Sequence, residues 1–202
     1  FLEYKFGIPV FINNDGDLFA YGGALGGALP EVNARLEALG SPKKYKNLVG
    51  YTFGTGLGVG LVIDNRLNRG DNSCVETFCL RHKKMPEIIV EDGASIIGGG
   101  ITAARKWIMP SLLNELRSKM HQLNGNELNR VQMKVYDLDD ETEFREFAKG
   151  AQRPLKVYGT DRYVAYDPQK RIGVTISKLG ASQAISVGAY AFALSQLDTE
   201  NA

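Results

Sequence analysis

The sequence predicts an α/β fold, because short apolar runs typical of strands alternate along the chain with segments of helical periodicity. Hydrophobic residues make up 44% of the 202 residues and charged residues 23%, a composition typical of globular domains with a packed core. No internal repeat and no low-complexity linker interrupts this alternation. The length therefore indicates one large domain or one lobe of a larger protein.

The overall charge and the cysteine content exclude several classes of protein. With 24 basic and 23 acidic residues the net charge is +1, which gives no basic footprint for nucleic acid or for an anionic membrane surface. The two cysteines, Cys74 and Cys79, make no disulfide framework, and this usage fits a reducing compartment. We find no signal peptide and no apolar run of membrane-spanning length, so we expect a cytoplasmic protein.

In the first third of the chain we expect a β-rich run, then a helical region interrupted by glycines, and then two strands. A short β-rich run comes first at 7–12, and residues 20–39 look helical in parts. Two strands are expected at 48–53 and 57–64. The second strand ends on Asp64-Asn65, which is a hairpin signal.

The rest of the chain is expected to alternate between helices and strands. Residues 102–120 carry a helical period, and Pro110 should kink this helix or split it in two. The other expected elements are a strand at 131–138, a helix at 141–149, strand signals at 154–167, a strand at 171–176 and an apolar terminal helix at 182–197.

The stretch Y-T-F-G-T-G-L-G-V-G at 51–60 is the most specific motif, because four alternating glycines and one Thr lie between two apolar strands. Glycine lets the backbone approach a ligand closely, and successive N–H groups in such a turn form a nest for an anion such as phosphate. The motif is neither a P-loop nor a dinucleotide fingerprint, since no Gly-Lys-Ser/Thr follows and the turn leads into a strand. A tight glycine hairpin without a ligand is the alternative.

A second motif, N-N-D-G-D at 13–17, directly follows the apolar run 7–12. A turn would explain Asn13, Gly16 and Asp17, because these residue types bond their own backbone and tolerate unusual dihedral angles. A catalytic carboxylate at the end of a strand would explain Asp15, since sites in α/β folds lie outside the carboxyl ends of strands. The local pattern leaves both interpretations open.

Four motifs in a fixed order resemble one known family: N-N-D at 13–15, G-T-G-L-G at 54–58, R-G-D-N-S-C-V-E at 69–76 and G-A-S-Q-A-I-S-V-G-A-Y-A at 180–191. The chain resembles the large lobe of the ROK family (repressors, open reading frames and kinases). Its members are bacterial sugar kinases and sugar-responsive repressors of the actin/hexokinase/Hsp70 ATPase superfamily. The resemblance implies an α/β fold of the ribonuclease-H-like or actin-like ATPase kind, with a mixed sheet flanked by helices.

The resemblance also implies a domain arrangement. Residues 1–202 would be a single large C-terminal lobe of a two-lobe sugar kinase, and the terminal helix at 182–197 would pack back toward the small N-terminal lobe. The family's opening Asp-x-Gly-Gly-Thr does not occur in this sequence. The chain also starts at Phe1 without Met, so we expect a piece cut from a longer protein, although a processed start would explain the same observation.

By resemblance, the activity would be ATP-dependent phosphorylation of a hexose or N-acylhexosamine hydroxyl, with Mg²⁺ on the phosphates. Asp15 would be the general base that takes the proton of the attacking hydroxyl, with Asp17 as the rival carboxylate. The implied sugar ligands are Asn14, Glu76 and Glu91, and the implied cradle for the ATP phosphates is Gly54, Thr55, Gly56 and Gly58.

Several positions depart from the family pattern. Cys79 stands where a sugar-contacting His is expected, and His82 belongs to a basic run that we interpret as solvated. The family's zinc-binding cysteines are absent, so no zinc is expected, although Glu91 keeps its spacing to Ser95, where the family begins a helix. Acidic residues at 137–140 replace the glycines expected on the adenosine side.

These departures keep alternatives open. The isolated lobe is expected to be inactive or nearly so, because lobe closure excludes water from phosphoryl transfer. A sugar-sensing transcriptional regulator that binds ligand without catalysis is the main alternative, and a structural lobe with neither activity is the third. An exposed apolar face on the terminal helix would favour association, so we expect a homodimer that contacts sugar and ATP but no nucleic acid and no membrane.

Overall fold

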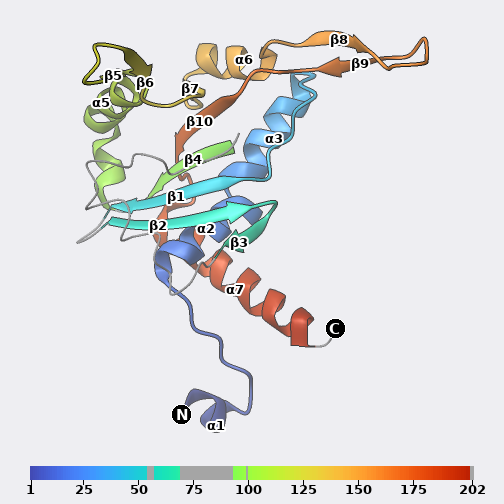
Figure 1. The fold of residues 1–202 in the computed structure, drawn as a ribbon. Helices are drawn as coiled ribbons and strands as arrows, with labels where there is room; N and C mark the ends of the chain where they lie inside the picture. The colour runs from blue at the N-terminus through green and yellow to red at the C-terminus, as the bar shows by residue number, and fades with distance from the viewer. Residues whose placement is uncertain (54–56, 69–92, 99, 201–202) are drawn as a thin grey trace.

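The computed structural model describes residues 1–53, 57–68, 93–98 and 100–200, and within them a mixed sheet of six strands forms the centre of the fold (Figure 1). The strands follow the spatial order β3-β2-β1-β4-β10-β7. Their bounds are β1 Leu48–Phe53, β2 Leu57–Ile63, β3 Arg66–Asn68, β4 Gly93–Gly98, β7 Lys134–Asp137 and β10 Arg171–Ile176. β1, β4, β10 and β7 run parallel, whereas β2 and β3 join as an antiparallel meander. The predicted mixed sheet flanked by helices is confirmed.

The predicted hairpin after β2 is also confirmed. Asp64 and Asn65 adopt positive φ angles of 52° and 59°, the pair of left-handed conformations that a type I′ turn needs. Lys46 lies beside the turn and bonds Asp64 Oδ1 at 3.0 Å. The turn brings β3 back antiparallel along β2, with Val62 opposite Leu67.

Helices cover both faces of the sheet, and each face has its own apolar core. Leu48 and Val49, neighbours in β1, lie in different cores because successive strand residues point to opposite faces. The first core contains residues of α2, α3, α6 and α7, and the second contains Met109 and Leu113 of α5. The bounds are α2 Asp15–Leu25, α3 Ala28–Ala38, α5 Arg105–Arg117, α6 Glu141–Lys149 and α7 Gly180–Glu200.

Helix α2 lies unusually close to the sheet because glycines face it. A methyl group added at Gly60 would lie 2.4 Å from the carbonyl oxygen of Gly16, and one at Gly50 would lie 2.9 Å from Ala20 Cα. Real side chains do not tolerate such contacts with backbone atoms. The backbone of α2 therefore packs directly onto β1 and β2 at these two positions.

The smaller elements lie at the periphery. They are α1 Leu2–Phe6, the 3₁₀ helix η1 Gly100–Ala104, and the strand pairs β5 Lys119–His121 with β6 Glu127–Asn129 and β8 Arg153–Lys156 with β9 Tyr163–Tyr166. The β8–β9 ribbon extends away from the sheet, and the N-terminal segment runs away from it on another side (Figure 1). None of the described helices is long and apolar enough to cross a lipid bilayer.

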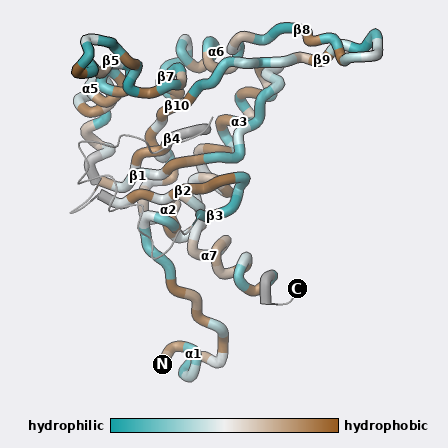
Figure 2. Tube along the Cα trace, in the orientation of Figure 1, coloured by the Kyte–Doolittle hydropathy of each residue, from teal (hydrophilic) through white to brown (hydrophobic). Residues whose placement is uncertain are grey.

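The expected strand at 7–12 is wrong. This segment is apolar, as Figure 2 shows, but it contains no strand, and Ile12 is 84% exposed. A run of β-prone residues becomes a strand only when another strand pairs with it, and this segment leads into α2 outside the sheet.

Two further expectations need correction. Pro110 does not split its helix, because α5 is continuous from Arg105 to Arg117. Pro110 is exposed on α5, where water can satisfy the carbonyl that loses its N–H partner. Ser95, where a helix was implied, lies within β4, which pairs with β1 and β10 near the middle of the sheet.

Candidate active site

The motif N-N-D opens a helix rather than closing a strand. Asn14 is the N-cap of α2, and its Oδ1 accepts a hydrogen bond from the backbone N–H of Gly16 at 2.8 Å. Asn13 Oδ1 in turn accepts from the N–H of Asn14 at 2.8 Å. The expected strand end is therefore wrong. The interpretation that the amides shape the local backbone is confirmed for Asn14, whereas the catalytic role of Asp15, the first residue of the helix, stays a prediction.

The two candidate carboxylates of this motif differ sharply in accessibility. Asp15 is exposed in the first turn of α2, where the positive end of the helix dipole stabilises a carboxylate. Asp17 is only 3% exposed and belongs to the part of α2 that packs on Gly60. A substrate approaching from solvent therefore meets Asp15 and not Asp17.

The fold brings the start of α2 close to the described end of the glycine turn. Gly60 of β2 contacts Gly16, the residue after Asp15. Gly58 lies two residues earlier on the same face of β2, which is roughly 7 Å along a strand. The predicted residues Asn14, Asp15 and Gly58 therefore share one region, whereas Gly54, Thr55, Gly56, Glu76 and Glu91 lie outside the described residues, as do Cys74, Cys79 and His82.

A second polar cluster lies where β7 and β10 end. Nη2 of Arg105, the first residue of α5, lies 3.4 Å from Asp137 Oδ1 and 3.2 Å from Asp139 Oδ2. Asp139 also accepts hydrogen bonds from Thr175 Oγ1 at 2.7 Å and from the N–H of Ile176 at 3.3 Å. The sequence showed acids in place of glycines here but gave no sign of Arg105, because its partners are about 30 residues away.

The charge of this cluster disfavours an anionic ligand. Two carboxylates surround one guanidinium, so the cluster keeps an excess negative charge. Burial raises the pKa of Asp137, against the opposing effect of Arg105 and of the N–H of Asp139. β1 runs parallel to β4, β10 and β7, so the carboxyl end of β1 at Phe53 and this acidic cluster lie at the same end of the parallel strands.

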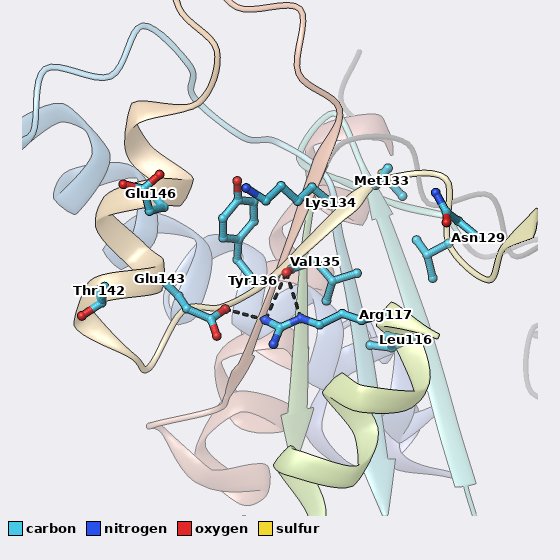
Figure 3. Close-up of a pocket in the computed structure, with 11 residues that line it drawn as sticks. Leu116, Arg117, Asn129, Met133, Lys134, Val135, Tyr136, Thr142, Glu143 and Glu146 are labelled. Atoms are coloured by element: carbon cyan, nitrogen blue, oxygen red, sulfur yellow. Dashed lines mark hydrogen bonds and ion pairs between the residues drawn. The ribbon is translucent and has the colours of Figure 1, made fainter. Parts of the chain in front are cut away.

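A pocket of about 470 Å³ opens beside the edge strand β7 (Figure 3). Arg117 donates from Nε and Nη2 to the carbonyl oxygen of Val135 at 3.2 and 3.1 Å, and it pairs with Glu143. Glu143 accepts from the N–H of Asp137 at 2.7 Å. These side chains bond the backbone groups of β7 that face away from β10. Among the described site residues, Asn14, Asp15 and Gly58 do not line the pocket.

The acidic residues of the described chain assemble no metal site. No group of three or more His, Cys, Asp or Glu side chains is placed to hold a metal ion among the described residues. Asp137 and Asp139 are engaged by Arg105 instead. The expectation that zinc is absent stays a prediction, since Cys74, Cys79 and His82 fall outside the described part of the chain.

Comparison with known proteins finds similarity to a solved glucokinase structure over most of the chain and to xylose repressors over a shorter part. The fold is similar to a crystal structure of a glucokinase from Parabacteroides distasonis, with a TM-score of 0.81 and 40% identity over 96% of this chain and 71% of that one. Xylose repressors of Bacillus spizizenii and Bacillus subtilis are 33% identical over 70 residues and 30% identical over 69 residues. Each repressor match spans only 15% of the repressor. No protein-family model matches the chain.

The sheet order, the helices on both faces and the structural match define the actin-like ATPase fold, related to sugar kinases. Within that class the glucokinase match covers nearly the whole chain, and the repressor matches add a second branch of the same family. The chain belongs to the ROK family. This family contains both kinases and repressors that do not catalyse, so the activity of this member is a separate question.

Proposed function

We propose that this chain is the large lobe of an ATP-dependent sugar kinase that phosphorylates a hydroxyl of a hexose or an N-acylhexosamine. The observation that carries the proposal is the exposed carboxylate of Asp15 at the capped start of α2, beside the strand that leaves the glycine turn. The structural similarity to a glucokinase supports the same class of reaction. Residues 1–202 alone are expected to be inactive or nearly so, because a single lobe cannot close over two substrates.

Asp15 would act as the general base. A sugar hydroxyl becomes a better nucleophile when a placed carboxylate accepts its proton during attack on the γ-phosphate. The position of Asp15 on a helix whose backbone packs directly onto the sheet would fix this carboxylate in space. Asn14 uses its Oδ1 for the cap, which leaves its amide NH₂ group to donate to a neighbouring sugar hydroxyl.

The remaining sugar and phosphate contacts are proposed from the motif match. Glu76 and Glu91 would accept hydrogen bonds from further sugar hydroxyls. The backbone N–H groups around Gly54, Thr55, Gly56 and Gly58 would hold the ATP phosphates. Mg²⁺ would supply charge neutralisation on the phosphate oxygens. Of the proposed phosphate-binding residues, Gly58 is described, and it lies on β2. The same strand contacts the start of α2 through Gly60, so the proposed phosphate and sugar contacts would be close together.

The adenosine side does not fit equally well. Asp137 and Asp139 pair with Arg105 at the place where the resemblance expects glycines. We therefore propose no adenosine contact at these residues. This observation, together with the similarity to xylose repressors, favours the second candidate function: a sugar-sensing regulator that binds its ligand without phosphoryl transfer. The two candidates share the sugar site at Asn14 and Asp15 and differ in the use of ATP.

Release of ADP by the full-length protein, with ATP, Mg²⁺ and a panel of hexoses and N-acetylhexosamines, separates the candidates. The kinase predicts turnover with a subset of the sugars and loss of kcat by about 10²-fold or more in Asp15→Asn, with sugar binding retained. Glu37→Gln is the matched control, since Glu37 is an exposed acid of α3 whose carboxylate pairs with Lys44 at the surface. Saturable sugar binding by calorimetry without turnover would establish the regulator instead, and full activity of Asp15→Asn would remove Asp15 as the base.

A further inference from the structure

The pocket beside β7 has one apolar wall and one polar wall. Its volume of about 470 Å³ lies within the range of small-molecule sites. The apolar wall is formed by Leu116, Val131 and Met133, which pack against the second core of the protein. Thr142 and Glu146 of α6 line the other side (Figure 3). A ligand that fills this pocket therefore needs an apolar part and a polar part.

The backbone of β7 offers an unused hydrogen-bond donor at this pocket. The N–H of Lys134 bonds the carbonyl oxygen of Lys170, on the side of β10, at 3.1 Å. Backbone groups alternate in direction along a strand, so those of Val135 face away from β10. The carbonyl oxygen of Val135 accepts from Arg117, whereas no group in the described part of the chain accepts a bond from its N–H. Val135, which lines the pocket, can therefore donate to a ligand.

Two charged side chains that line the pocket have no ion-pair partner among the described residues. They are Lys134 on β7 and Glu146 on α6, and both are exposed. Lys134 Nζ lies 4.9 Å from the centre of the Tyr136 ring, a contact that gives its N–H groups no acceptor oxygen. The other two charged residues of the pocket, Arg117 and Glu143, pair with each other. The pocket therefore offers a cation and a carboxylate that are both available to a ligand.

The available donors and acceptors lie on different elements. Lys134 and the N–H of Val135 are neighbours on β7, and both can donate to a carboxylate. Thr142 and Glu146 are four residues apart on α6, so they lie side by side on one face of the helix, and both can accept from an ammonium group. A ligand that carries a carboxylate and an ammonium group would use both sets.

The charge of the lining argues against other classes of ligand. Two cations and two carboxylates line the pocket, so their charges cancel. Sugar phosphates and nucleotides carry at least one phosphate, and the carboxylates of Glu143 and Glu146 would repel it. A free sugar carries hydroxyl groups around its ring and would leave the apolar wall without an apolar partner. A zwitterion with an apolar side chain fits the charges and the apolar wall together.

We propose that this pocket binds a free α-amino acid with an apolar side chain, such as leucine or methionine. The carboxylate of the amino acid accepts from Lys134 and from the N–H of Val135. The ammonium group donates to Glu146 and Thr142, and the side chain packs on the apolar wall. Lys134 and Glu146 are long, exposed side chains, so they can rotate toward a ligand of this size.

Calorimetric titration of the full-length protein tests the class of ligand. L-Leucine, L-methionine and L-phenylalanine should bind saturably, and glycine, which has no side chain to bury, should bind about tenfold or more weakly. N-acetyl-L-leucine lacks the ammonium group and L-leucinamide lacks the carboxylate, so each should bind about fivefold or more weakly than leucine. Absence of saturable binding by all three apolar amino acids would overturn the proposal, as would equal affinity for leucine and glycine.

Charge-neutral variants of the same protein test the two sides of the pocket separately. Glu146→Gln should weaken leucine binding about fivefold or more, but it should not weaken N-acetyl-L-leucine further, because that compound lacks the group that Glu146 contacts. In the same way Lys134→Gln should weaken leucine and leave L-leucinamide unchanged. Lys149→Gln is the matched control, since Lys149 is an exposed residue of α6 outside the pocket, and it should bind leucine as the unchanged protein does. Unchanged leucine affinity in Glu146→Gln and Lys134→Gln, or an equal loss in Lys149→Gln, would overturn the proposal.

Discussion

Gly22 of α2 and Gly188 of α7 lie against each other where the two helices cross, and neither position has room for a side chain. A methyl group at Gly188 would lie 1.8 Å from the carbonyl oxygen of Leu18 and 2.9 Å from the nitrogen of Gly22. A methyl group at Gly22 would lie 1.9 Å from the carbonyl oxygen of Ala184. The two helices therefore meet backbone to backbone beneath the candidate active site.

The first prediction concerns this crossing. Gly188→Ala should lower the free energy of unfolding by about 1–3 kcal/mol or more, because the neighbouring atoms belong to the backbone and cannot rotate away. Urea-induced unfolding measures the effect. Ser186→Ala, on the exposed side of the same helix, is the control and should change stability by less than about 0.5 kcal/mol. Equal stability of the two variants would show that the helices can separate without cost.

The second prediction separates the two proposed uses of Asn14. Asn14→Ala removes the helix cap and should cost about 1 kcal/mol of stability, whereas Asn14→Ser supplies another capping oxygen and should keep most of it. Both variants lack the amide NH₂ group, so both should lose sugar affinity to a similar extent. Urea-induced unfolding and calorimetric titration with the sugar measure the two effects. Retained affinity in Asn14→Ser would assign Asn14 to the cap alone.

The third prediction concerns acid stability. Burial on its own would raise the pKa of Asp167, but hydrogen bonds from Arg171, Gln169 and Ala151 outweigh it and hold the pKa below its usual range. The folded-state pKa is therefore below the unfolded value, and the stabilisation is present above about pH 4 and lost as the pH falls through the folded pKa.

Asp167→Asn should accordingly lower stability at neutral pH by about 3–5 kcal/mol, since it leaves Arg171 buried without its carboxylate partner. It should also flatten the decline of stability below pH 4. Thermal unfolding between pH 3 and pH 7 measures both effects. Asp161→Asn serves as the control, because Asp161 is an exposed residue of the connection between β8 and β9. An unchanged acid profile in Asp167→Asn would assign acid unfolding to other carboxylates.

The fourth prediction concerns the edge strand β7. Arg117→Met should lower stability by about 1–3 kcal/mol, because the carbonyl of Val135 loses both of its hydrogen bonds from the guanidinium. The uncovered edge should also increase aggregation, which light scattering during refolding can detect. Glu143→Gln keeps an acceptor for the N–H of Asp137 and should be milder. Similar losses in both variants would place the effect in the ion pair and not in the strand edge.

Runs of apolar residues and helical periodicity in the sequence predicted several strands and helices correctly. The strands β1, β2 and β10 were found from their apolar runs, and α6 and α7 from their helical periodicity. The motif analysis located Asn14 and Asp15 but placed them at a strand end, because the apolar run at 7–12 looks like a strand when no information on pairing exists. The cap itself was detectable, since Asn followed by two acids is typical of a helix start.

Features that depend on distant partners were not predictable. β4, near the middle of the sheet, was missed because a short run containing Gly and Ser shows no alternation when both of its faces are buried. The contacts of Arg105 with Asp137 and Asp139, and those of Arg171 with Asp167, follow from how strands and helices stack. The pairing of β8 with β9 depends on a strand register that the amino-acid composition does not reveal.

The glycines that face α2 from β1, β2 and α7 also limit what this protein can do during a binding cycle. Glycine at Gly50, Gly60 and Gly188 lets the backbone of α2 pack directly against its neighbours, which leaves this helix little space in which to shift. We therefore expect the carboxylate of Asp15, the first residue of α2, to keep its position. If Asp15 is the proposed base, we expect rearrangement on binding to move the ligand toward Asp15 and to leave α2 in place.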